Sequence, residues 1–168
     1  FLLADRLRPG TSSQCFRGNP EQLRQTENAQ PCLFAVEMAA AAALEEGGIR
    51  PQAVAGFSLG EMAALTWAGS FCPEDGFRLT VRRGALMQAA AQRHPGGMAA
   101  VLKLPEQQVE TLCRASPSVH PVNYNCPGQL VVAGEKRALE AFCDTVRAAG
   151  GRTVPLPVSG AFHSPYMA

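Results

Sequence analysis

The sequence predicts an α/β protein in which a parallel-sheet core carries a small inserted subdomain of βαββαβ order. Two observations lead to this prediction. A short apolar run at 53–56 is followed by a glycine-flanked serine and by helix formers at 59–68, which is the order strand, sharp turn, helix. Beyond residue 97, short strand-like segments alternate with two helical segments. The predicted core comprises residues 1–97 and 159–168, and the predicted subdomain comprises residues 98–158.

Two long helices are predicted in the core. Residues 31–46 are mostly Ala, Leu, Met and Glu, and Gly47-Gly48 follow where a helix can end in a left-handed turn. Pro31 is expected at the first helical position, where its missing N–H costs nothing. The second helix begins at Pro73-Glu74-Asp75, whose acids favour the positive end of the helix dipole, and runs to about residue 92.

Four strands and two helices are predicted in the subdomain. The predicted strands are 98–104, 119–125, 129–133 and 152–158, and the predicted helices are 106–114 and 136–149. Turn residues such as Cys126-Pro127-Gly128 separate them. This order is that of the split βαβ motif of ferredoxin-like units.

Composition narrows the classes of function. The chain has 168 residues, of which 46% are hydrophobic, and its formal net charge of +1 gives no reason to expect a nucleic-acid or membrane partner. No apolar run reaches the ~18 residues that a membrane span needs. The six cysteines follow neither a metal-ligand spacing nor a compact disulfide framework. We therefore expect reduced thiols, no bound metal and a cytoplasmic location.

The segment Gly56-Phe57-Ser58-Leu59-Gly60 fits the nucleophile-elbow pattern of hydrolase-like α/β cores. In such an elbow, a strained turn lifts the serine hydroxyl clear of the backbone. The N–H of Leu59, at the start of the next helix, points to where an oxyanion develops during attack on an acyl carbonyl. The pattern predicts Ser58 as a nucleophile, and the alternative interpretation is a tight structural turn.

A serine nucleophile needs a base, and the chain has three histidines. His94 and His120 each precede a proline, one in a predicted loop and one at the subdomain edge, and both are expected to be solvated. His163 follows the last predicted strand, where the chain returns to the core. We predict His163 as the general base, with a packed structural histidine as the alternative. No aspartate stands out as a third catalytic group.

Five separated segments resemble, in order, the malonyl-CoA:acyl-carrier-protein transacylase family, which is part of the wider group of acyltransferases of fatty-acid and polyketide synthases. They are Gln25-Thr26-Glu27-Asn28-Ala29-Gln30-Pro31, Gly56-Phe57-Ser58-Leu59-Gly60-Glu61, Arg83-Gly84-Ala85-Leu86-Met87-Gln88, Asn123-Tyr124-Asn125-Cys126-Pro127-Gly128-Gln129 and Ser159-Gly160-Ala161-Phe162-His163-Ser164. Five motifs in one order are more specific than any single motif.

The resemblance implies roles for individual residues. In that family the serine is acylated by malonyl-CoA, the histidine acts as base and then as acid, and the arginine of the R-G-x-x-M-Q motif, here Arg83, binds the malonyl carboxylate. Gln30 is expected to line the active site, and Asn125 to lie near the acyl thioester or its pantetheine arm. From the residues alone, Arg83 is a solvated helix arginine like Arg82, and Gln30 and Asn125 are turn residues.

The resemblance also implies a function. It is the transfer of a malonyl group from malonyl-CoA to the phosphopantetheine thiol of acyl carrier protein through a malonyl-serine intermediate, in fatty-acid biosynthesis, with no cofactor. Phe162, directly before His163, resembles the variant that takes an unbranched malonyl unit. The alternatives are an acyltransferase domain of a polyketide synthase, a serine hydrolase, and an inactive fragment.

Departures from the family pattern concern the ends of the chain. The family's glutamine-bearing first motif and its final strands have no counterpart here, so we expect a chain truncated at both ends. Lys136 and Arg137, at the start of a predicted helix, are candidates for contact with an acidic carrier protein, with a solvated helix face as the alternative.

Overall fold

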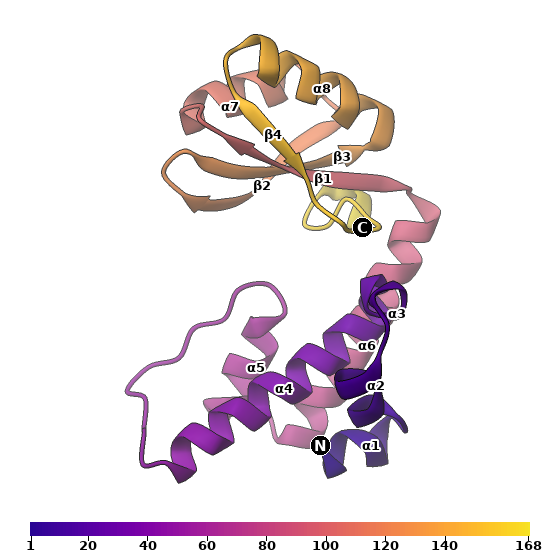
Figure 1. Cartoon of the computed structure of the whole chain (residues 1–168), viewed down its shortest axis with the longest axis vertical. Helices are drawn as coiled ribbons and strands as arrows, with labels where there is room; N and C mark the ends of the chain where they lie inside the picture. The colour runs from indigo at the N-terminus through magenta and orange to yellow at the C-terminus, as the bar shows by residue number, and fades with distance from the viewer. The chain divides into compact units, whose positions relative to one another are not determined.

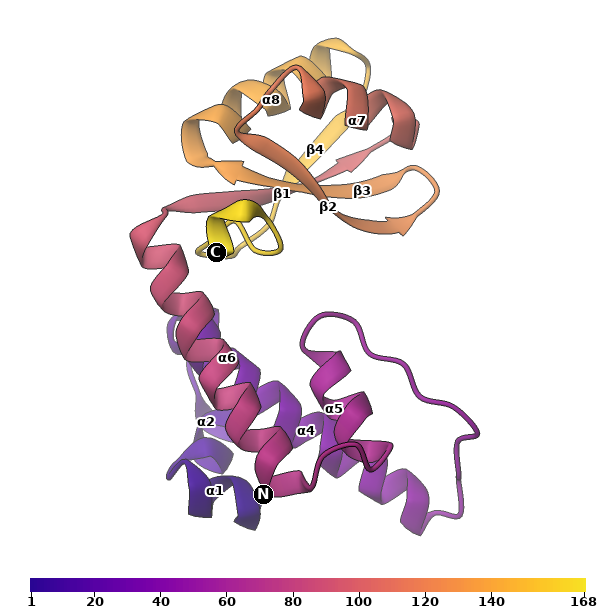
Figure 2. The same ribbon diagram turned by 180° about the vertical axis from the view of Figure 1, so that it is seen from behind.

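The computed structural model describes all 168 residues and divides them into two compact units, Phe1–Leu86 and Met87–Ala168 (Figures 1 and 2). The division falls within the long helix α6 (Pro73–Arg93). None of the helices combines the length and the apolar content that crossing a bilayer requires.

The first unit is helical throughout. Its elements are α1 (Leu2–Leu7), α2 (Thr11–Arg17), α3 (Pro20–Arg24), α4 (Thr26–Glu46), α5 (Gly60–Trp67) and the first part of α6. Phe34 of α4 and Phe77 of α6 form the centre of its core, with ring centroids 5.9 Å apart in an edge-to-face arrangement. Helices α1, α2 and α3 have 6, 7 and 5 residues, too few to show a clear hydrophobic period, so the sequence pattern did not predict them.

The predicted helices of this unit are confirmed, with one correction at the start of α4. Helix α4 begins at Thr26, so Pro31 lies inside it rather than at its first position. The first turn of α4 packs closely against α6. At Gly84, an added Cβ would lie 2.9 Å from the carbonyl oxygen of Thr26. The predicted left-handed end is confirmed at Gly48, whose φ is 84°.

The predicted strand at 53–56 is wrong for this structure. Residues 53–57 adopt no regular secondary structure and form part of the long connection between α4 and α5 (Figure 1). A strand requires a hydrogen-bonded neighbour, and the first unit contains helices only. The mixed α/β class is confirmed, but the parallel sheet is absent, since every strand pairing in the chain is antiparallel.

The second unit is a four-stranded antiparallel sheet with two helices on one face (Figures 1 and 2). Its elements are β1 (Gly96–Leu102), α7 (Glu106–Arg114), β2 (Val119–Cys126), β3 (Gln129–Glu135), α8 (Lys136–Ala148), β4 (Arg152–Pro155) and the short 3₁₀ helix η1 (Pro165–Met167). The strand order is β2-β3-β1-β4. The strands and helices from β1 to β4 follow one another in the predicted order.

The alternation of side chains along β3 explains why both faces of the sheet are covered. Leu130 and Val132 join the core beneath α7 and α8, whereas Val131 and Ala133 face the other side. There they pack against Ala161, which is fully buried in the segment after β4. For this reason residues 159–168 group with the second unit, and not with the first as the predicted boundaries had it.

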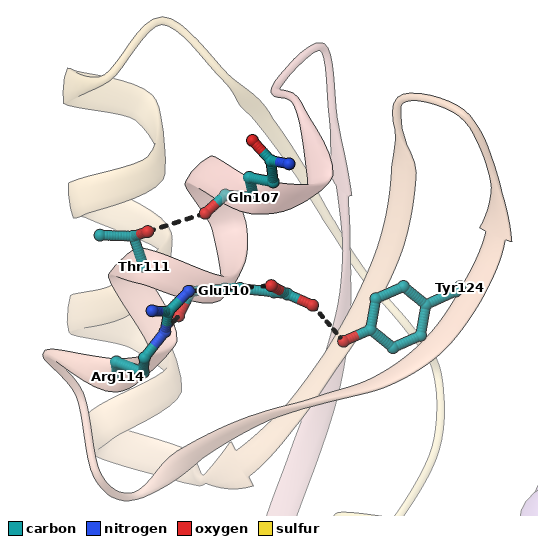
Figure 3. A network of polar contacts seen from close by, with 5 residues as sticks. All are labelled: Gln107, Glu110, Thr111, Arg114 and Tyr124. Carbon is teal, nitrogen blue, oxygen red and sulfur yellow. Dashed lines mark hydrogen bonds and ion pairs between the residues drawn. The ribbon is translucent and has the colours of Figure 1, made fainter.

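A polar contact joins the end of the edge strand β2 to α7 (Figure 3). The hydroxyl of Tyr124 donates to Glu110 Oε1 over 2.9 Å, and Arg114 Nη2 lies 3.8 Å from Glu110 Oε2. The hydrogen bond to the carboxylate raises the pKa of Tyr124. One turn earlier in α7, the hydroxyl of Thr111 donates to the carbonyl of Gln107 over 2.8 Å. The Tyr124–Glu110 hydrogen bond thus connects an exposed stretch of β2 to the helix layer, and the other two contacts lie within α7.

The core of the second unit yields a stability prediction. Phe142 is 1% exposed on α8, in the cluster between the helices and the sheet. We expect Phe142→Ala to lower the free energy of unfolding by about 3–5 kcal/mol, because the lost ring leaves a cavity. Urea denaturation followed by circular dichroism measures this. Exposed Glu140 on the same helix is the matched control, and a loss of similar size in Glu140→Ala would contradict the assignment.

Candidate active site

Ser58 lies in a strained turn directly before α5. Its φ of 54° is in the left-handed region, which non-glycine residues rarely adopt. The amide of Gly60 donates to the carbonyl of Phe57 over 2.9 Å and closes the turn around the serine. A strained backbone of this kind persists only where the surrounding structure holds it, and it is typical of functional positions.

The two glycines of the elbow are not equivalent. A Cβ added at Gly56 would lie 2.0 Å from the carbonyl oxygen of Gly60, so only glycine fits there. A Cβ added at Gly60 would meet only Glu37 Oε1, at 3.7 Å, which is an ordinary contact. Close backbone packing therefore requires glycine at Gly56, whereas this structure leaves room for a side chain at Gly60.

Leu59 is the N-cap residue of α5 and its side chain is buried. Backbone N–H groups at a helix N-terminus have no intrahelical acceptor, and the helix dipole places a partial positive charge there. The N–H of Leu59 follows the serine directly, which is the position expected of an oxyanion donor.

Arg83 of α6 connects Ser58 to α4. Its Nη2 donates to Ser58 Oγ over 3.2 Å, and its Nη1 donates to Gln30 Oε1 over 2.6 Å. Gln30 is 4% exposed, and its Nε2 donates to Thr26 Oγ1 over 2.7 Å. The structure thus brings together three residues predicted for the site, Ser58, Arg83 and Gln30, with Leu59 adjoining the serine. Sequence reasoning gave Thr26 no role, although its i,i+4 spacing to Gln30 places both on one helix face.

Arg83 carries a partly desolvated positive charge. Burial lowers the pKa of Arg83, while the negative charge of Glu61, in the first turn of α5, raises it. An arginine remains protonated through shifts of this kind. Its neighbour Arg82 is exposed. Arg83 is thus the less exposed of the two adjacent arginines, in agreement with the carboxylate-binding role that the resemblance implies for it. A half-buried guanidinium with a donor on a serine is suited to binding an anion there.

A pocket of about 470 Å³ lies between α4, α5 and the connection that joins them, and Gly56, Phe57 and Gly60 of the elbow are among its lining residues. Its lining is mostly apolar, with Met38, Ile49 and Trp67 among the larger side chains. Glu37 also lines it, with Oε2 buried and without a hydrogen-bond partner. Burial raises the pKa of the Glu37 carboxyl.

His163 lies in the second unit, in a turn with defined geometry. Its φ is 62°, and the preceding residues are fixed by the pairing of Gly160 with Pro95 and by the complete burial of Ala161. The hydroxyl of Ser164 donates to the carbonyl of Ala161 and closes the turn. His163 is therefore presented on a rigid turn. Its pairing with Ser58, which lies in the first unit, stays a prediction.

The other two histidines have ordinary surroundings. His94 is exposed immediately after α6. His120 is half-buried on β2, with its ring centroid 6.0 Å from that of Tyr166. The packing of His120 against an aromatic ring differs from the solvated position expected from the sequence.

Asn125 lies at the end of β2, in the exposed hairpin with β3. Its Nδ2 donates to Gln129 Oε1 over 3.1 Å across the hairpin. Gln129 pairs with Leu102 at one end of β1, whereas Gly160, shortly before His163, pairs with Pro95 beyond the other end. At about 3.3 Å per residue, the length of β1 separates these positions by roughly 20 Å. The expected place of Asn125 beside the acyl thioester stays a prediction.

Comparison with known proteins assigns the family. The sequence model of the acyl transferase domain family matches residues 11–168. The chain belongs to the acyl transferase domain family. Over 161 residues it is 37% identical to the malonyl CoA-acyl carrier protein transacylase of Bacillus subtilis, covering 93% of this chain and 51% of that protein. Over 167 residues it is 41% identical to the polyketide synthase GfsB of Streptomyces halstedii, covering 98% of this chain and 3% of that protein.

Solved structures extend the comparison to the fold. The crystal structure of the malonyl CoA-acyl carrier protein transacylase of Clostridium perfringens has a TM-score of 0.91 and is 36% identical, covering 99% of this chain and 54% of that one. This acyl transferase chain therefore spans about half the length of the transacylases that it matches.

The elbow geometry yields a prediction that separates its two glycines. We expect Gly56→Ala to abolish soluble expression or to lower the melting temperature by more than 5 °C, because its Cβ overlaps backbone atoms of Gly60. Gly60→Ala should change the melting temperature by less than 2 °C, because its Cβ fits and alanine favours the helix. Differential scanning fluorimetry measures both, and equal shifts for the two variants would contradict the geometry.

Proposed function

We propose that the whole protein transfers a malonyl group from malonyl-CoA to the phosphopantetheine thiol of an acyl carrier protein, through a malonyl ester of Ser58. The observation that carries this proposal is the position of Arg83, with one guanidinium nitrogen 3.2 Å from Ser58 Oγ and another held by Gln30. In a malonyl ester of Ser58, a single methylene group separates the free carboxylate from the ester carbonyl. A guanidinium beside the serine is within reach of that carboxylate.

The hydrogen bond between Arg83 and Ser58 also suits the nucleophile. Arginine only donates, so Ser58 Oγ is the acceptor and its own proton is left for a base. In the first half-reaction, Oγ attacks the thioester carbonyl, His163 takes the hydroxyl proton, and the N–H of Leu59 donates to the oxyanion. The C–S bond then breaks, and the CoA sulfur leaves with the proton from His163. In the second half, the carrier thiol gives its proton to His163 and its sulfur attacks the ester carbonyl. The ester C–O bond then breaks, the malonyl group stays on the carrier sulfur, and Ser58 Oγ regains the proton from His163.

Electrostatics support malonyl over an uncharged acyl group. Arginine can make two parallel charge-assisted hydrogen bonds to a carboxylate. Such bonds contribute about 1.5–3 kcal/mol, which corresponds to a preference of roughly ten- to a hundredfold over acetyl. A hydrolase for simple esters would gain nothing from a half-buried arginine at this position.

A second candidate within the same chemistry is an acyltransferase domain of a polyketide synthase. The 41% identity to the polyketide synthase GfsB supports it. In either setting the preference for an unbranched unit is a proposal that rests on Phe162. The exposed Lys136 and Arg137 at the start of α8 are candidates for contact with an acidic carrier.

We further propose a finer description of the fold. The strand order β2-β3-β1-β4, with α7 and α8 on one face, supports a ferredoxin-like subdomain at 98–158.

The acyl-enzyme intermediate is directly testable in the whole protein. Radiolabelled malonyl-CoA should label the wild type and not Ser58→Ala, because the ester forms on Oγ. Addition of carrier protein bearing its thiol arm should then move the label to the carrier. Gel autoradiography measures both steps. Label released only as free malonate would favour a hydrolase, and a wild type that takes up no label would exclude both enzymes.

Arg83 is tested by the choice of acyl group. We expect Arg83→Ala to lower kcat/KM for malonyl-CoA by ten- to a hundredfold more than for acetyl-CoA, because only malonyl has a carboxylate to bind. Steady-state kinetics with both thioesters measure this. Arg82→Ala, an exposed neighbour on the same helix, is the control and should change neither value. Equal losses for both thioesters in Arg83→Ala would contradict the assigned role.

A further inference from the structure

We infer that Thr26 is a positioning residue that sets the preference for malonyl over acetyl by holding the Gln30 amide that aims Arg83. The inference rests on the proposed role of Arg83. Three hydrogen bonds join the side chains of four residues, Thr26, Gln30, Arg83 and Ser58, in that order.

The chemistry of the amide explains why its orientation matters. A glutamine amide has an acceptor end and a donor end, whereas a guanidinium has donors only. Only Oε1 of Gln30 attracts Arg83, so Nε2 must point elsewhere. Thr26 Oγ1 accepts from Nε2 over 2.7 Å and thereby keeps Oε1 directed at Nη1 of Arg83, 2.6 Å away.

Burial makes the loss of the hydrogen bond between Gln30 and Thr26 costly. Gln30 is 4% exposed and Thr26 is 8% exposed, so water does not readily replace a lost partner at this position. A buried N–H that loses its acceptor costs more than a solvated one. Without the Thr26 hydroxyl, the amide therefore gains by turning toward another acceptor, and Arg83 then loses the partner of its Nη1.

Backbone packing fixes the distance that these bonds span. Gly84 follows Arg83, and a Cβ added there would lie 2.9 Å from the Thr26 carbonyl oxygen and 3.1 Å from the Cα of Glu27. The helix that bears the arginine thus rests on the turn that bears the threonine. The close approach sets the position of Arg83, and the Thr26 hydroxyl sets its direction through Gln30.

The expected effect is larger for substrates with a carboxylate. Acetyl-CoA uses Ser58 and the oxyanion donor but offers Arg83 no carboxylate to bind. A misdirected guanidinium therefore weakens malonyl loading more than acetyl loading. Loss of stability alone would reduce both activities equally, so the ratio of the two kcat/KM values distinguishes positioning from folding.

The test uses the whole protein and compares isosteric variants. We expect Thr26→Val, which keeps the shape and removes the hydroxyl, to lower the malonyl-to-acetyl ratio of kcat/KM by about three- to tenfold, mainly through a higher KM for malonyl-CoA. Thr26→Ser, which keeps the hydroxyl, should restore the ratio. Thr80→Val is the matched control, because Thr80 is fully buried on α6 and its hydroxyl has no hydrogen-bond partner.

The outcomes distinguish the inference about Thr26 from the proposed function. A lowered ratio in Thr26→Val, with normal ratios in Thr26→Ser and Thr80→Val, supports the inference. An unchanged ratio in Thr26→Val while Arg83→Ala lowers it overturns the inference and leaves the proposed function standing. An unchanged ratio in Arg83→Ala overturns both. If Thr26→Val does not fold, Thr26→Ala removes the same hydroxyl with less steric demand and is measured in its place.

Discussion

The candidate site in the first unit depends on the acceptors that surround one partly desolvated arginine. A guanidinium taken out of water must find acceptors, and Arg83 finds them in the Gln30 amide and the Ser58 hydroxyl. These acceptors come from separate segments, one from α4 and one from the turn before α5. The glycine after Arg83 allows α6 to approach α4 closely enough for the bonds to form. Sequence positions far apart are thereby held around one charge.

The elbow adds a second constraint to the same place. The left-handed backbone of Ser58 costs conformational energy of order 1–2 kcal/mol, and the turn closed by Gly60, the fit of Gly56 and the bond from Arg83 hold it in place. The serine is thus fixed in a position suited to chemistry rather than to local stability. The turn at His163 has a similar backbone conformation in the second unit and is held by the burial of Ala161.

Local patterns predicted the elements that carry their own signals. Helix α7 has the predicted bounds, and the hairpin of β2 and β3 follows from the turn at Cys126-Pro127-Gly128. The prediction of a strand at 53–56 was wrong because a strand needs hydrogen-bonded neighbours from other parts of the chain. A short stretch of sequence does not contain that information. The predicted start of α4 was wrong, because the preference of proline for the first helical position does not exclude a position further inside; the helix begins at Thr26, in a turn that packs against Gly84 of α6.

The candidate site shows a similar division between local and spatial information. Ser58, Arg83 and Gln30 were predicted from motifs, and the structure places their side chains in one hydrogen-bonded chain. Thr26 was missed because a threonine near a helix start has many ordinary explanations, and its role depends on the direction of a neighbouring amide. The backbone of Ser58 finally limits which nucleophiles evolution or engineering can install there. A cysteine fits a left-handed residue as serine does, but a β-branched threonine does not, so thiol chemistry is accessible to this scaffold whereas a secondary alcohol is sterically barred.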